Sequence, residues 1–294
     1  MSAQGGVPMR IFDVHSHWGT KRGYPLRTEA ELAKQDYTWR SAPVYATEDE
    51  MVAEFRRNRV RVILDLGFTK DLPVDEAREF NDYAIDTQKR YADTIFGNWI
   101  TLHPTTGKAG VAEFRRCIEA SPGFIGLSVP AASLGFPACD PVFDPFYDVC
   151  LEYGRPVMVT VGYTGRGAGL PGGGGIRLEL CHPRYVDELA VRFPGLTIIA
   201  GRPAWPWQDE MIAVLLHKPN VWNELHGWSP KHYTDALKRE IPRRLKHKIM
   251  FGADYPLLRY ERLVKDWHDL GYDPETLAKV FHENAEALFG VQQA

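Results

Sequence analysis

The sequence predicts a single (β/α)8 barrel, and three observations carry this prediction. Eight short apolar runs rich in β-branched residues recur along the chain, as buried parallel strands do. Amphipathic helical stretches separate most of these runs. The 294 residues are 44% hydrophobic, which is enough for one large core, and no interior stretch has the composition of a linker. We therefore expect one domain over residues 1–294, and periodicity leaves a doubly wound open sheet as the alternative.

The predicted strands are short enough, and apolar enough on both faces, to be buried within one sheet. Valine, isoleucine and leucine dominate them, and each is followed by turn-forming or polar residues. In chain order, they cover residues 11–14, 60–66, 95–102, 124–129, 157–161, 196–200, 221–225 and 249–251.

The predicted helices alternate with the strands and carry apolar residues at helical spacing. They cover residues 48–59, 111–120, 146–153, 185–193, 209–217 and 232–245. A further helix over residues 274–289 ends the chain, and we expect it to cover the flank of the barrel.

Composition narrows the partners and the compartment. The net charge is −3, with 35 basic and 38 acidic residues interleaved, so the sequence offers no basic face for nucleic acid and no polybasic membrane segment. A small-molecule substrate is the expected partner, and homo-oligomerisation is left open. The four cysteines lack C-x-x-C spacing, which indicates reduced structural thiols. No signal peptide or membrane-length apolar run is evident, and we expect a cytoplasmic protein.

Residues capable of acid-base chemistry follow the first and the last predicted strand. His15 and His17 stand two apart, so they point to the same side of an extended chain. Asp254 follows the last apolar run. Because barrel enzymes carry their chemistry at the C-terminal ends of the strands, we expect these three side chains to meet there. An inert buried Asp254 paired with Arg202 is the structural alternative.

Several segments resemble the amidohydrolase-2 branch of the amidohydrolase superfamily, which includes aminocarboxymuconate semialdehyde decarboxylase, resorcylate-type decarboxylases and several lactonases. The matching segments span nearly the whole chain. They are residues 12–17, 155–162, 192–201, 206–211, 251–256 and the closing Glu283-Asn284-Ala285. The resemblance implies a TIM-type barrel enzyme that acts in aromatic catabolism.

Two positions depart from the pattern that the resemblance implies. The family usually has metal-binding histidines where this chain has Thr160 and Arg202. Threonine is a poor zinc ligand, and a guanidinium has no lone pair to donate. An ion such as zinc would be left with His15, His17 and Asp254 as ligands, which is a chemically sufficient set. We favour no cofactor, because Arg202 would repel the ion and can itself bind a substrate carboxylate or oxyanion.

Three more residues are candidates for the same pocket. His226 ends the seventh predicted strand and shares a face with Glu224 by alternation, so we expect it to reach the pocket as an acid-base group; a partly exposed strand-end histidine is the alternative. Trp228 belongs to a set of tryptophans that would form an aromatic wall. Arg166 lies in the glycine-rich segment 162–175, which we interpret as a loop or lid over the pocket.

These residues predict a hydrolase for a small carboxylated or cyclic, lactone-like and aromatic-derived substrate. Asp254 is the expected general base, His15 and His17 orient the carbonyl, and Arg202 and Thr160 bind the substrate. The resemblance includes pyrone-dicarboxylate lactonase, which works without a metal. Two alternatives stay open: a non-oxidative decarboxylase with an acid at Asp254 or His226, and a non-catalytic binding protein.

Overall fold

The computed structural model describes residues 10–24, 28–39 and 46–291, and it contains an eight-stranded parallel sheet with its strands in chain order. The strands are β1 (Ile11–His17), β2 (Val60–Asp65), β3 (Ile95–Ile100), β4 (Phe124–Val129), β5 (Val157–Thr160), β6 (Ile198–Gly201), β7 (Val221–Glu224) and β8 (Ile249–Met250). Backbone hydrogen bonds from Val14 to Phe251 and from Asp254 to His15, each 3.0 Å long, join the two ends of the sheet. The predicted barrel is confirmed, and the open sheet is excluded.

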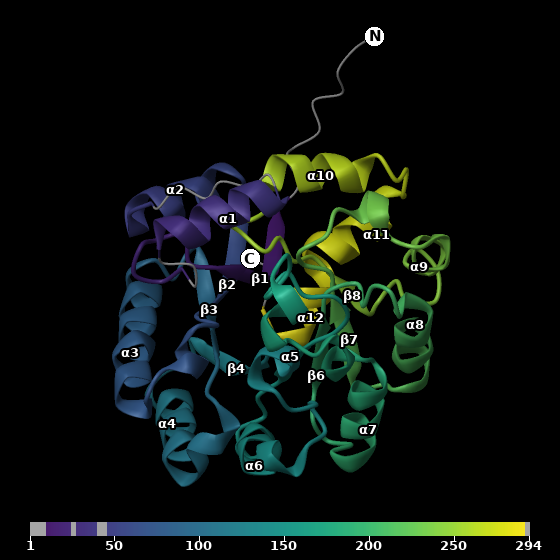
Figure 1. The fold of residues 1–294 in the computed structure, drawn as a ribbon. Coiled ribbons are helices and arrows are strands. Elements are labelled where there is room, and N and C mark those ends of the chain that lie inside the picture. Colours follow the sequence, from purple (N-terminus) through teal and green to yellow (C-terminus); the bar gives the residue numbers. More distant parts are fainter. Residues whose placement is uncertain (1–9, 25–27, 40–45, 292–294) are drawn as a thin grey trace.

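Helices surround the strands (Figure 1). They are α1 (Glu29–Trp39), α2 (Glu48–Arg57), α3 (Val74–Arg90), α4 (Gly107–Ala120), α5 (Ala131–Leu134), α6 (Asp144–Glu152), α7 (Arg184–Arg192), α8 (Gln208–His217), α9 (Asp235–Glu240), α10 (Tyr260–His268), α11 (Pro274–Ala278) and α12 (Asn284–Leu288). The predicted terminal helix is present, with a π-helical turn over Lys279–Glu283 between α11 and α12. Asn284 anchors it to the barrel by donating to the carbonyl of Ile249 at 2.7 Å.

Helix prediction failed for several elements, and only for some of them does the buried face explain the failure. The sequence did not predict α3, whose buried positions include Ala77, Asn81 and Ala84. It also did not predict α1 and α10, while the helix expected over residues 232–245 is only the short α9. The small and polar buried residues of α3 weaken its helical hydrophobic pattern, whereas α10 buries the large side chains of Tyr260, Leu263 and Trp267.

An apolar plug fills the barrel interior and separates its two ends. Its fully buried members come from most of the strands. They are Phe12, Val14, Ile63, Trp99, Ile125, Met158, Ile199 and Met250, with Phe96, Leu288 and Phe289 packed against them. The site described below lies above this plug, at the C-terminal ends of the strands.

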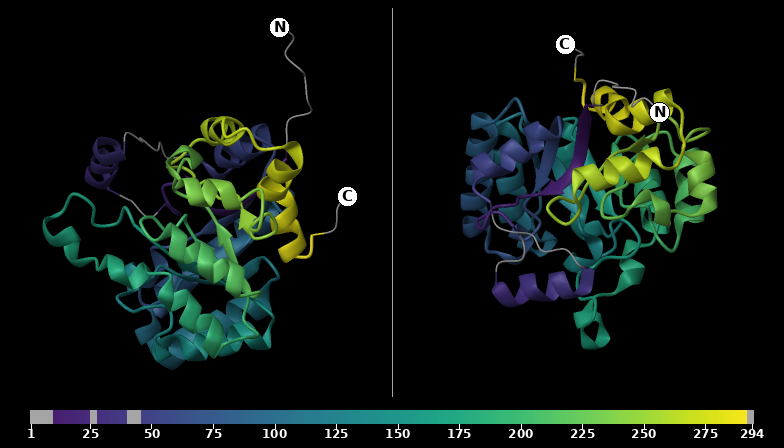
Figure 2. Two further views of the ribbon diagram at one scale, coloured as in Figure 1. Left: turned by 90° about the vertical axis from the view of Figure 1, so that its right-hand side faces the viewer. Right: turned by 90° about the horizontal axis from the view of Figure 1, so that it is seen from above.

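Two segments project at one end of the barrel, opposite the end covered by α12. Figure 2 shows α1 and the stretch between β5 and α7 on that side. The glycine-rich segment forms part of this stretch, so its predicted place beside the strand ends agrees with the structure. No helix among the described residues is long and apolar enough to cross a membrane. The four cysteines are buried and form no disulfide, as expected.

Candidate active site

Asp13 holds together the two chain segments that carry the first and last candidate site residues. Its Oδ1 accepts hydrogen bonds from the backbone amides of His15 and Ala253, both at 3.1 Å. Its Oδ2 accepts from Ser16 Oγ at 2.5 Å and from Tyr260 at 2.6 Å. Burial raises the pKa of Asp13 to about 7, against the opposing effect of these donors. Asp13 therefore ties the end of β1 to the loop that follows β8.

His15 and His17 meet over the barrel mouth, although β1 is not a regular strand there. A bulge between Asp13 and Ser16 puts one extra residue into β1 relative to β2. The two rings lie edge to face with their centroids 5.0 Å apart. Burial, reinforced by the nearby His226 and His17, lowers the pKa of His15, so His15 is neutral at neutral pH.

The partly buried His17 forms a pair with the buried Asp254. His17 Nε2 lies 3.2 Å from Asp254 Oδ1, and His17 Nδ1 lies 3.2 Å from the carbonyl oxygen of Asp65. Burial disfavours the imidazolium, but the Asp254 contact and the Asp65 carboxylate outweigh it and raise the pKa of His17. Burial would likewise raise the pKa of Asp254, but His17 and Arg202 lower it, so Asp254 is a carboxylate.

The backbone is strained where two key residues enter the site. Arg202 has φ of 81° and Asp254 has φ of 63°, a left-handed region that side-chain-bearing residues adopt at some cost. Hydrogen bonds hold both: the amide of Arg202 donates to the carbonyl of Glu224 at 2.8 Å, and that of Asp254 to His15. Such strain concentrates at functional sites because the surrounding fold must maintain it.

A hydrogen-bonded chain runs from Glu224 through His226 to Arg202. Arg202 Nε donates to His226 Nε2 at 3.0 Å. Because a guanidinium only donates, His226 Nε2 is the accepting nitrogen, and the ring proton sits on Nδ1. That proton points to Glu224 Oε1, 2.5 Å away. His226 also stacks on His15, with centroids 3.9 Å apart and the rings 15° from parallel.

Thr160 and Trp228, which were predicted to bind the substrate, lie near Arg202. Thr160 is buried and pairs in register with Gly201, the last residue of β6, which Arg202 follows in the chain. Trp228 packs against Trp205 and Tyr163, with centroids 5.7 and 6.2 Å away. Besides its bond to His226, Arg202 donates a hydrogen bond to the carbonyl of Tyr163, at 3.0 Å. An aromatic cluster therefore borders the guanidinium, as expected for part of the tryptophan set.

Arg166 does not contact the histidines. It pairs with Asp71 at 3.2 Å, and its side chain is 48% exposed. Asp71 also pairs with Lys70, whose own side chain is only 1% exposed, at 2.6 Å. This cluster joins the glycine-rich segment to the loop after β2. Asp254 and Arg202 do not form the ion pair that was the structural alternative, because Arg202 donates to His226 and to Tyr163 instead.

Sequence reasoning assigned no role to Asp65 or Lys70. Asp65 ends β2 and accepts hydrogen bonds from Ser128 at 2.8 Å and Thr101 at 3.2 Å. Burial raises its pKa, while the nearby His17 opposes that rise. The sequence contains a hint of this role, because Asp65 lies near the end of the apolar run 60–66. A single acid in such a run does not by itself reveal that its side chain lies at the end of the barrel.

Three side chains of the cluster could hold a divalent ion by their spacing alone. The ligand atoms of His15, His226 and Asp254 lie within 4.8 Å of one another, so the candidate set contains His226 in place of the predicted His17. His17 is instead engaged with Asp254 and Asp65. The only lone pair of His226 already accepts from Arg202, and a guanidinium at 3.0 Å repels a cation at that nitrogen. These residues therefore fit a metal ion poorly.

Comparison with known proteins identifies the family. The sequence model described as Amidohydrolase matches residues 12–291. The chain therefore belongs to the amidohydrolase family. Among curated protein sequences, none matches the chain.

Solved structures share the fold at low sequence identity. A 2,6-dihydroxybenzoate decarboxylase from Rhizobium has a TM-score of 0.71 and 14% identity, over 96% of this chain and 99% of the other. A 5-carboxyvanillate decarboxylase from Novosphingobium aromaticivorans, complexed with manganese and a nitrobenzoic acid, has a TM-score of 0.69 and 16% identity. The match covers 99% of this chain and 98% of the other. A probable 2-pyrone-4,6-dicarboxylic acid hydrolase from Acinetobacter baumannii has a TM-score of 0.61 and 15% identity, over 96% of this chain and 100% of the other. These likenesses show the fold alone.

Proposed function

We propose that this protein is a metal-independent hydrolase of a small carboxylated, lactone-like substrate with an aromatic-type ring. The observation that carries the proposal is the hydrogen bond from Arg202 to His226, which puts a fixed positive charge where a metal ion would bind. The remaining guanidinium N–H groups are suited to a substrate carboxylate or to the oxyanion of an acyl-transfer intermediate. The aromatic side chains of Trp228 and Trp205 offer flat surfaces beside that charge.

The Asp254–His17 pair supports both proton transfers of hydrolysis. As a carboxylate, Asp254 accepts a proton from the water that attacks the lactone carbonyl. The ring C–O bond then breaks, and the leaving oxygen takes a proton from His17, whose two nitrogens both face oxygen acceptors. Transfer of the proton from Asp254 to His17 restores the pair. His15, which is neutral and stacked on His226, helps to orient the substrate carbonyl.

Decarboxylation is a second candidate, because two of the solved neighbours are decarboxylases of hydroxylated aromatic acids. In that reaction an acid on the protein protonates the ring carbon that loses carbon dioxide. Against the effect of burial, the contact with Asp254 raises the pKa of His17, so His17 would supply that proton.

Product analysis separates the two reactions. The purified protein is incubated in ¹⁸O-labelled water with 2-pyrone-4,6-dicarboxylate and, separately, with 2,6-dihydroxybenzoate. We expect ring opening of the pyrone with one ¹⁸O in the new carboxylate, and no carbon dioxide from either compound. Carbon dioxide release from the benzoate without ring opening would replace hydrolysis by decarboxylation. Binding of both compounds without turnover would favour a binding protein.

A further inference from the structure

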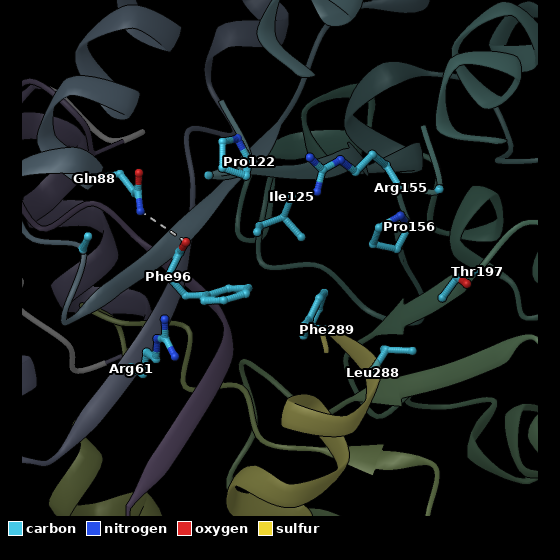
Figure 3. Close-up of a pocket in the computed structure, with 13 residues that line it drawn as sticks. Arg61, Gln88, Phe96, Pro122, Ile125, Arg155, Pro156, Thr197, Leu288 and Phe289 are labelled. Carbon is cyan, nitrogen blue, oxygen red and sulfur yellow. Dashed lines mark hydrogen bonds between the residues drawn. The ribbon is translucent and has the colours of Figure 1, made fainter. Parts of the chain in front are cut away.

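The end of the barrel opposite the candidate active site contains a pocket, shown in Figure 3. Its volume is about 440 Å³, within the range of small-molecule sites. The lining comes from the starts of the strands and from the end of α12. Phe96 and Ile125 are the second residues of β3 and β4, and Phe289 follows α12. The pocket is therefore distinct from the cluster around Asp254, and the apolar plug lies between them.

Two arginines line this pocket, and among the described residues neither forms an ion pair that would neutralise its positive charge. Arg155 and Arg61 approach it from opposite sides in Figure 3. The Nε atoms of both are buried, and within residues 10–24, 28–39 and 46–291 neither has an acceptor. In those same ranges no carboxylate forms an ion pair with Arg155 or with Arg61, and the other residues of the sequence include no aspartate or glutamate.

Both arginines are half-buried, with their Nε atoms fully buried, so an anion beside them would offset part of the cost of removing the charge from water. Burial lowers the pKa of Arg155, and no acid offsets this effect. It also lowers the pKa of Arg61, which Glu286 offsets only in part. A partly desolvated guanidinium gains from a carboxylate, which matches its planar pair of donors.

The pocket lining between the two arginines is aromatic and apolar, which favours a ligand with a flat ring. The rings of Phe96 and Phe289 lie 5.9 Å apart between centroids, and Arg61 stacks on Phe96 with its guanidinium carbon 4.7 Å from the ring centre. Pro122, Pro156 and Leu288 complete an apolar lining. A flat ring gains contact area on these surfaces, while an inorganic anion does not. We propose that this pocket is a second ligand site, which binds a small aromatic monocarboxylate between Arg155 and Arg61.

The test uses benzoate as the probe and isothermal titration calorimetry as the measurement. Titrations are made in the Arg202→Met background, because benzoate would also bind an anion receptor at the proposed active site. We expect Arg155→Met to weaken binding at least tenfold, Arg61→Met to weaken it less, and Arg155→Lys to retain part of it. Arg177→Met is the matched control, since Arg177 is 66% exposed and pairs with Glu179, and it should leave the dissociation constant unchanged. Benzamide, which lacks the charge, should bind weakly to every variant.

Each outcome bears on the proposal. Melting temperatures of the variants verify that they fold, and a 4-bromobenzoate soak should place the bromine beside Phe96 and Phe289. Binding that is unchanged by both Arg155→Met and Arg61→Met would overturn the proposal. So would inorganic phosphate competing as well as benzoate, because the ring would then contribute nothing. Benzoate binding that vanishes with Arg202→Met alone would also reject this second site, while leaving the proposed function intact.

Discussion

Replacing Asp254 by asparagine is expected to reduce turnover by roughly two or more orders of magnitude. Asparagine keeps the size and accepts the left-handed backbone that position 254 requires, with φ of 63°, so the fold should survive. What disappears is the carboxylate that takes the proton from the attacking water. Steady-state turnover of the ring-opening reaction, with circular dichroism to verify folding, is the measurement.

The control for this variant is Asp266→Asn. Asp266 is also largely buried and accepts a hydrogen bond from Ser229 at 2.6 Å, but it lies on α10, outside the cluster. We expect its turnover to stay near that of the unmodified protein. If Asp254→Asn retained near-normal turnover as well, Asp254 would be a structural acid that holds His17, and the proton acceptor would have to be sought elsewhere.

Changing Arg202 should affect charged substrates most. Arg202→Lys keeps the charge but loses the planar pair of donors and the link to His226, whereas Arg202→Met keeps only the apolar stem. We expect the lysine variant to be impaired and the methionine variant to be worse. A desolvated carboxylate left without its partner costs about 3–5 kcal/mol, which corresponds to a loss of roughly two to four orders of magnitude in kcat/KM.

The measurement compares a carboxylated lactone with its neutral methyl ester, in these variants and in the exposed control Arg262→Met. The loss should concentrate on the carboxylated compound and be absent from the control. Equal activity of the lysine and methionine variants on both compounds would mean that Arg202 does not bind the substrate carboxylate.

The fold was predictable because the barrel repeats one pattern eight times. Errors in single elements, such as the missed α3, did not change the strand count. The cluster was predictable in part for the same reason: His15, His17 and Asp254 all follow apolar runs, and parallel strands bring their ends to one face.

Pairing within the cluster was not predictable from spacing. Alternation places Glu224 and His226 on one face, but it does not reveal that the ring proton points to Glu224 or that Arg202 bonds to the other nitrogen. These contacts depend on the positive φ of Arg202, which no local pattern in the sequence indicates. Arg166 failed to join the histidines for a related reason, because a long loop can place its side chain over any neighbouring strand end, and here it reaches Asp71.

The most direct test of the account is the metal content of the purified protein, measured together with its turnover after chelation. With Arg202 bonded to the lone pair of His226, we expect well under one equivalent of zinc or manganese. Ring opening should continue unchanged in excess chelator, and added zinc or manganese should not increase it. One equivalent of bound metal, with turnover that chelation abolishes and the ion restores, would contradict the account.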